Sequence, residues 1–343
     1  MVLPNSQPQL AQLPRDLGEP GVRWLGPGDG ALLVDLIRAC YGETYSYREL
    51  YEPDAIEARW ARGELLSLAH VDAQGRLDGH TGFLRKDPKH EYVESALSLI
   101  RPGARRGFAV EPGPMWRALL SAWAQEVAFI HQNTTTRHPR AQLYAARYMR
   151  ARATGWVFDY ALAETIVGLA ETPAPMHALT MSTVLEPSPL ARPLAVPDGP
   201  WHTWLARLVR GVLPEATVVP VPCANVREPW VLTSIENNPS LGLRRQGVES
   251  TGEGGGSQDA TPSRVDLVHL PMRPALVRAA WRGLQAGGYV PVGLRPHRHR
   301  DCEIVLQRIE LERGREALET MVLTGNRVRE LASGWLEACT LTS

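Results

Sequence analysis

The sequence has almost no lysine and no closely spaced cysteines. Lys86 and Lys89 are its only lysines, so arginine carries nearly all of the positive charge, and we assign no function to this bias. The four cysteines form no Cys-x-x-Cys pair. Their spacing argues against a zinc knuckle and against a disulfide framework, so we expect free thiols.

Long apolar runs and a net charge are also missing. No segment approaches the ~18 consecutive apolar residues of a membrane-spanning helix, and residues 1–16 lack a basic stretch followed by an apolar one. Lys and Arg together number 37, as do Asp and Glu, so the net charge does not indicate a nucleic-acid or membrane partner. We therefore expect a cytoplasmic protein that binds neither.

The composition is that of a globular protein, with 44% hydrophobic and 22% charged residues among 343. This length predicts two domains. Residues 1–20 are predicted to form a loose tail, and the proline-dense residues 173–200 are predicted to be the boundary region between the domains. We place one domain at 21–185 and another at 186–343, the latter with a flexible loop at 249–263.

Hydrophobic periodicity predicts a mixed order of elements in the first domain. A strand at 21–25 precedes a helix with its N-cap at Asp29 and its C-cap at Gly42, and a second helix follows at 54–62. Gly75 supplies the turn of an antiparallel hairpin. The predictions continue with a strand at 91–102, helices at 115–130 and 141–149, and a strand pair from Gly155 onward.

The second domain shows a related pattern, which suggests a degenerate internal duplication. In both domains a helix is followed by a pair of a glycine and an aromatic residue and then by two strands. A C-terminal helix is expected at about 314–334. The other predicted elements are a helix at 201–213, strands at 216–223, 228–236 and 265–270, a helix at 274–288, and strands at 289–294 and 301–309.

The junction from the strand at 91–102 to the helix at 115–130 is the strongest chemical signal. A helix start offers unpaired backbone N–H groups and the positive end of the helix dipole, both of which bind anions. Gly103 and Gly107 allow close approach of a pyrophosphate, and Arg105 and Arg106 add charge. The alternative is an ordinary strand-to-helix turn.

The order of elements around this junction resembles the GNAT N-acetyltransferase superfamily. ARRGFA places Gly107 and Ala109 at the small positions of the family loop, but Ala104 stands where the family has Arg or Gln. Further support comes from the segment GHTGF and from TTTRHPRAQLYAARYMRARATGWVFDY. CYGETYSYRELYEP, RHPRAQ and LARPLAVPDGPW resemble a subgroup with an added C-terminal lobe, so that the resemblance covers most of residues 21–310.

The resemblance implies an α+β fold with a GNAT-type mixed central sheet flanked by helices, followed by a second, degenerate GNAT-like lobe without its own coenzyme site. It also implies acetyl-CoA as the co-substrate. The residues that it assigns to the coenzyme are Gly103, Arg105, Arg106, Gly107, Phe108, Ala109, His138 and Gln142.

Catalytic roles follow from the same resemblance. Glu94 matches the position of a general base, and its alternative is a solvated surface residue. Tyr144 and Tyr148 lie four apart on the helix that supplies a tyrosine acid, and their alternative is packing in the core or against the coenzyme.

Several polar residues have both a functional and a structural interpretation. His138 and Gln142 either contact the pantetheine arm or cap the helix that follows. His80 either contacts the substrate or is an ordinary strand histidine. PHRHRDCE at 296–303 contains metal-ligand residue types, but its arginines would repel a cation, so we expect a solvated turn and no metal.

The sequence thus predicts an N-acyltransferase that moves acetyl from acetyl-CoA to a small-molecule or peptide amine, with a homodimer as one expected assembly. Two alternatives remain. One is a non-catalytic acyl-CoA sensor, which is favoured because Ala104 stands where the family has Arg or Gln. The other is an interaction protein in which both lobes are degenerate.

Overall fold

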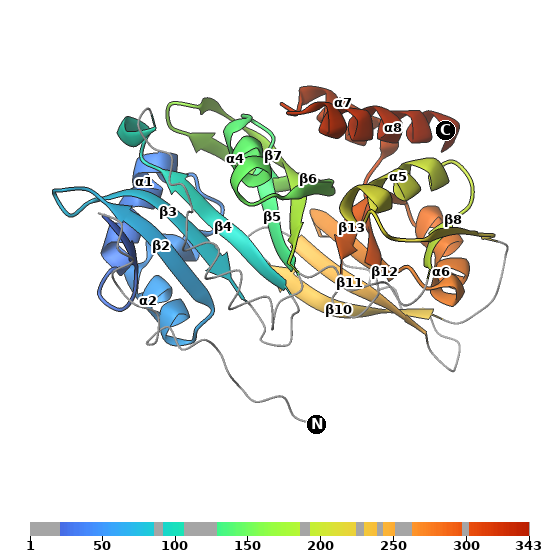
Figure 1. The fold of residues 1–343 in the computed structure, drawn as a ribbon, viewed down its shortest axis with the longest axis horizontal. Helices are drawn as coiled ribbons and strands as arrows, with labels where there is room; N and C mark the ends of the chain where they lie inside the picture. The colour runs from blue at the N-terminus through green and yellow to red at the C-terminus, as the bar shows by residue number, and fades with distance from the viewer. Residues whose placement is uncertain are drawn as a thin grey trace. The chain divides into compact units, whose positions relative to one another are not determined.

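A computed structural model describes residues 21–85, 92–105, 129–185, 193–223, 230–238, 243–250, 263–296 and 302–342 (Figure 1). These residues form two compact units. The first extends to Asn133 and includes Ala163–Ala174, and the second contains Thr134–Leu162 and Pro175–Ser343. This division does not coincide with the expected one at residue 185, because most of the strand pair that begins at Gly155 belongs to the second unit.

The first unit is a sheet covered by two helices. Helix α1 (Gly30–Tyr41) and helix α2 (Pro53–Ala61) pack against the sheet around a core that includes Leu36, Ile56 and Leu65 (Figure 1). A 3-10 turn, Arg48–Tyr51, joins the helices. The strands, in spatial order, are β1 (Val22–Trp24), β2 (Leu65–Val71), β3 (Leu77–Leu84), β4 (Tyr92–Ile100) and the first part of β5 (Phe129–Thr135).

These elements confirm most of the predictions for this region. The β2–β3 hairpin turns where Gly75 adopts φ +79°, a conformation that glycine allows at little cost. Gly42 has φ +57° at the end of α1, as expected of a C-cap glycine. The helix predicted at 115–130 extends too far, because Phe129 and Ile130 are the first residues of β5, and its remaining residues lie outside the described ones.

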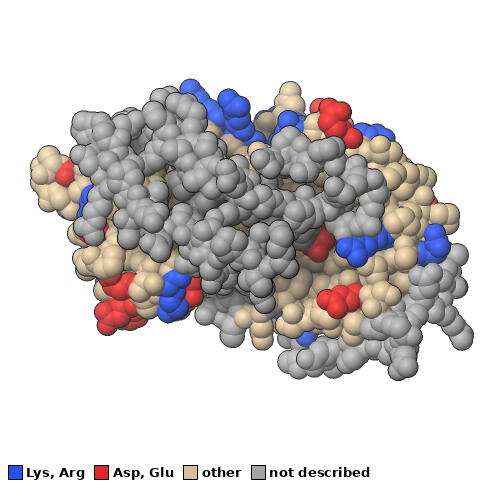
Figure 2. Space-filling model, turned by 60° about the horizontal axis from the view of Figure 1, so that its bottom comes forward, with Lys and Arg blue, Asp and Glu red and all other residues tan. Residues whose placement is uncertain are grey.

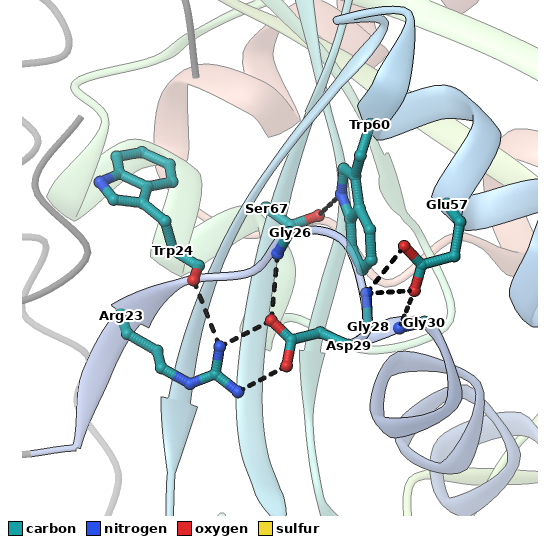
Figure 3. A network of polar contacts seen from close by, with 9 residues as sticks. All are labelled: Arg23, Trp24, Gly26, Gly28, Asp29, Gly30, Glu57, Trp60 and Ser67. Carbon is teal, nitrogen blue, oxygen red and sulfur yellow. Dashed lines mark hydrogen bonds and ion pairs between the residues drawn. The ribbon is translucent and has the colours of Figure 1, made fainter. Parts of the chain in front are cut away.

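The start of α1 is held by a carboxylate other than the predicted one (Figure 3). Asp29 stands at the N-cap position, but its side chain forms a bidentate ion pair with Arg23 and accepts from the backbone N–H of Gly26. Glu57 of α2 instead accepts from the N–H of Gly30 at 2.7 Å and from that of Gly28 at 3.0 Å. This carboxylate stabilises the positive helix end and joins α1 to α2.

The second unit contains most of the remaining elements. Its main sheet has the order β7-β6-β13-β14-β12-β11-β10, and β8 pairs with β9 in parallel. Helix α6 packs against strands β10 to β13, and α5 packs against α8. The helices are α4 (Arg140–Tyr148), α5 (His202–Val212), α6 (Pro274–Ala286), α7 (Leu311–Thr320) and α8 (Asn326–Thr342), and the strands are β6 (Arg152–Ile166), β7 (Ala170–Val184), β8 (Leu194–Pro197), β9 (Val218–Val221), β10 (Trp230–Asn238), β11 (Leu243–Ser250), β12 (Val265–Pro271), β13 (Tyr289–Pro296) and β14 (Cys302–Arg308).

Three predictions for this region were wrong or incomplete. The proline-dense residues 173–200, interpreted as the boundary region, contain most of β7 and the buried strand β8. The predicted C-terminal helix is two helices, separated by a turn in which Gly325 has φ +83°. Strand β11 was not predicted, and it extends to Ser250, into the first residues of the expected flexible loop.

The strand pairings agree with an internal repeat. β4 is antiparallel to β3 and parallel to β5, and the chain then continues into α4, β6 and β7. β11 is likewise antiparallel to β10 and parallel to β12, and the chain then continues into α6, β13 and β14. Both stretches therefore order six elements in the same way.

All four cysteines are buried and carry free thiols in the structure. Within the described parts of the chain, no helix is long and apolar enough to cross a membrane. On the face that Figure 2 shows, acidic and basic side chains of the described residues are interspersed and do not gather into one large patch of a single sign.

Two glycines join β6 to β13. Gly155 is paired with Gly293, and a Cβ added to Gly155 would lie 2.2 Å from the carbonyl oxygen of Val292 and 2.3 Å from the Cα of Gly293. Gly155 also has φ +138°, which side chains rarely adopt. Both constraints exclude any larger residue.

We predict that Gly155→Ala destabilises the protein by about 3 kcal/mol, because backbone atoms cannot yield to the new methyl group. Urea unfolding measures this loss. The matched control is Gly334→Ala in α8, where the nearest atom is a side-chain carbon at 3.3 Å and alanine favours the helix. Equal stability of the two variants would contradict the proposed backbone contact.

Candidate functional site

The parallel contact between β4 and β5 is short. Tyr92–Ser95 pair with Phe129–Gln132, whereas β4 continues to Ile100. Parallel neighbours that stop pairing leave backbone groups available for another partner. The residues around this point, all in the first unit, form the candidate site.

Glu94 lies at this parallel contact and is buried, with only 5% of its surface exposed. Its carboxylate accepts a hydrogen bond from the Asn133 amide at 3.2 Å. The alternative of a solvated surface residue is therefore wrong. Asn133 was not predicted, because an isolated asparagine in a strand has no distinguishing sequence pattern. The role of Glu94 as a general base stays a prediction.

Strand β4 contains a bulge directly after its contact with β5. Gly82 pairs with Ala96 and His80 with Leu99, so a single β3 residue stands opposite two residues of β4. Leu97, one of those two, has φ +54°. A leucine in this left-handed region costs about 1 kcal/mol and requires support from its surroundings.

His80 provides a hydrogen bond at the bulge. Its Nδ1 lies 2.8 Å from the carbonyl oxygen of Leu97, and its side chain is buried. Burial lowers the pKa of His80 from 6.5 to about 4, so the imidazole is neutral at neutral pH. Its 3% exposure favours the strand-histidine interpretation over direct contact with substrate.

The described part of the predicted phosphate loop ends at Arg105. Gly103 is exposed in a short turn, Pro102–Ala104, and a Cβ added to it would meet no atom within 4 Å. Arg105 donates to the carbonyl oxygens of Ile100 and Val167, so part of its guanidinium has a structural role. The other predicted phosphate-loop residues lie outside the described ones: Arg106, Gly107, Phe108 and Ala109.

The remaining candidates belong to the second unit. Tyr144 and Tyr148 are half-buried on α4, and their ring centroids are 5.4 Å apart, which agrees with the predicted shared face. The side-chain amide of Gln142 forms four hydrogen bonds. Its amide donates to the carbonyl oxygens of Thr135 and Val322 and accepts from the N–H and hydroxyl of Thr324.

These four bonds favour the structural alternative for Gln142, which ties the start of α4 to the turn before α8. His138 is half-buried just before α4. Nothing in the structure assigns it to the coenzyme or to the helix, so both interpretations stay open.

No group of three His, Cys, Asp or Glu side chains among the described residues is placed to hold a metal ion. Residues 297–301, which contain His297, His299 and Asp301, lie outside the described residues, so the predicted turn there stays untested.

No protein-family model matches this chain, and no curated protein does. Solved structures match about half of it. A spermidine N-acetyltransferase mutant from Vibrio cholerae is 16% identical, covers 48% of this chain and 92% of its own, and has a TM-score of 0.36. A ribosomal-protein-S5-alanine acetyltransferase from Vibrio fischeri is 14% identical, with coverages of 48% and 92% and a TM-score of 0.34.

A GNAT-family acetyltransferase from Staphylococcus aureus covers 48% of this chain and 99% of its own at 10% identity, with a TM-score of 0.34. These structures belong to the kind of protein that the sequence resembles. The second GNAT-like lobe stays a prediction.

The buried histidine predicts how stability depends on pH. Between pH 6.5 and about 4 the unfolded chain protonates this imidazole and the folded chain does not, so stability falls as the pH falls through this window. We expect His80→Asn, which lacks the titrating ring, to lose about 2 kcal/mol less than the wild type between about pH 7 and about pH 5.

Urea unfolding at both pH values measures this difference. His269, whose pKa is also lowered to about 4 by burial, remains in both proteins and contributes equally. An equal loss in the two proteins would show that His80 is not held neutral in the folded state.

Proposed function

We propose that the first unit binds acetyl-CoA beside β4 and transfers its acetyl group to a primary amine. The observation that carries this proposal is the short parallel contact of β4 and β5, with buried Glu94 at the contact and the Leu97 bulge directly after it. A proton acceptor and redirected backbone groups therefore lie on one strand.

The transfer reaction requires only a few groups of the protein. Glu94 would accept, directly or through a water, the proton that the attacking amine loses. Backbone N–H groups of β4 after the bulge would donate to the thioester oxygen as it gains negative charge. The amine nitrogen then replaces sulfur on the acyl carbon, and the departing thiolate takes up a proton. That Tyr144 or Tyr148 donates this proton is implied only by the family resemblance.

The loop after β4 would hold the pyrophosphate. Support comes from the sequence pattern at Gly107 and Ala109 and from the position of the loop at the end of β4. Of the two predicted arginines, Arg106 is the better candidate to bind the pyrophosphate, because the guanidinium of Arg105 already donates to two backbone carbonyl oxygens.

We propose further that residues 186–343 contain a degenerate GNAT-like lobe. The repeated order of β10, β11, β12, α6, β13 and β14 supports this proposal. The acceptor would be a small-molecule or peptide amine used in the cytoplasm, and a homodimer is the assembly to test. An acyl-CoA sensor is the second candidate function, favoured by Ala104.

Replacing Glu94 by Gln should lower kcat/KM for acetyl transfer by about 10²- to 10⁴-fold, because the amide cannot accept a proton. The affinity for acetyl-CoA should stay unchanged, since Gln preserves the shape and the contact with Asn133. Thiol release across a panel of small and peptide amines measures transfer. Glu319→Gln, at an exposed position on α7, is the control.

Wild-type rates in the Glu94→Gln protein would contradict a base at this position. Wild-type binding of acetyl-CoA without transfer to any amine would favour the sensor instead.

Replacing Gly107 by Val should abolish acetyl-CoA binding, because a branched side chain blocks close approach of the phosphates. The melting temperature without ligand should not change. A thermal shift with acetyl-CoA, present in the wild type and absent in the variant, measures this. Normal affinity in the variant would mean that the pyrophosphate binds elsewhere. If acetyl-CoA shifted the melting temperature of neither protein, both the acetyltransferase and the acyl-CoA sensor would be contradicted.

A further inference from the structure

The bulge in β4 leaves the carbonyl oxygen of Leu97 without a place in the β3–β4 ladder. The register passes from Gly82 and Ala96 directly to His80 and Leu99. A buried carbonyl oxygen without a partner destabilises a fold by about 1–3 kcal/mol. The His80 imidazole supplies the hydrogen bond, at 2.8 Å from Nδ1.

This contact determines the tautomer of His80. A carbonyl oxygen only accepts, so Nδ1 must carry the proton and donate it to Leu97. Nε2 is then a lone-pair acceptor, and it is buried without a hydrogen-bond partner among the residues that the structure describes. The ring therefore has one interaction that fixes it, and that interaction is with the strained residue of β4.

The surroundings hold the imidazole in this place. His80 and Gly82 lie on the same face of β3, and a Cβ on Gly82 would be 3.1 Å from Cε1 of His80 and 3.1 Å from the carbonyl oxygen of Ala96. The glycine thus leaves the space that the ring and the bulge occupy. With 3% of its surface exposed, His80 reaches solvent too little to act as a substrate ligand.

We propose that His80 is a positioning residue for acetyl transfer: by holding the carbonyl of Leu97, it fixes the backbone of β4 that follows the contact with β5. This inference rests on the proposed function, because it assigns the N–H groups after the bulge to the thioester oxygen. A displacement of about 1 Å at such donors costs about 100-fold in rate.

The first test needs no substrate. Nitrogen-15 NMR of the full chain labelled at histidine should show His80 protonated at Nδ1, the less common neutral tautomer. Protonation at Nε2 instead would overturn the proposal, since Leu97 would then have no donor.

The second test compares three variants in acetyl transfer. His80→Asn places an amide N–H near the position of Nδ1 and should retain a kcat within about threefold of the wild type. His80→Leu removes the donor and should lower kcat about 10- to 100-fold, with little change in the dissociation constant of acetyl-CoA. His80→Gln, whose amide extends toward the Nε2 position, should resemble His80→Leu.

A kcat that is retained in His80→Asn but lowered in His80→Gln separates a positioning role from a general loss of stability. This comparison also tests the role of His80 if His80→Leu does not fold. Equal kcat values in the wild type, His80→Gln and His80→Leu would overturn the role of His80 while leaving the proposed function intact. An inactive wild type would instead refute the proposed function, and the positioning role with it.

Discussion

Strand β4 must satisfy different neighbours along its length, and this constraint organises the first unit. Near its start it is antiparallel to β3 and parallel to β5, whereas after Ser95 only the contact with β3 continues. The bulge at Leu97 lies at this change, where the backbone adopts a conformation that leucine disfavours. A buried neutral histidine supports it, and buried Glu94 lies on the regular side of it.

The second unit depends on close backbone contact. Gly155 and Gly293 bring β6 and β13 together with no room for a Cβ, and Trp335 of α8 donates from its indole to the carbonyl oxygen of Pro291. Gln307 of β14 bonds both backbone groups of Phe158 in β6. These contacts tie β6 to the C-terminal elements, and most of β6 accordingly belongs to the second unit.

The sequence predicted elements whose pattern is local. One-sided periodicity located α1, α2 and α6, and Gly75 located the hairpin turn. Strand β8 was missed because the proline-dense stretch around it was interpreted as a domain boundary, although the one proline of β8, Pro197, is tolerated in its short parallel pair. The bulge could not be predicted, because a left-handed leucine has no sequence pattern. Glu94 was identified through family resemblance, whereas its contact with Asn133 depends on a strand pairing that no local pattern encodes.

In the proposed reaction acetyl-CoA binds along β4 after the bulge, where backbone N–H groups would donate to the thioester oxygen. Hydrogen–deuterium exchange of the full chain, with and without acetyl-CoA, tests it most directly. We expect acetyl-CoA to slow the exchange of the amides at residues 96–100 and to leave helix α5 (His202–Val212), the internal reference, unchanged. Equal exchange at residues 96–100 under saturating acetyl-CoA would contradict it.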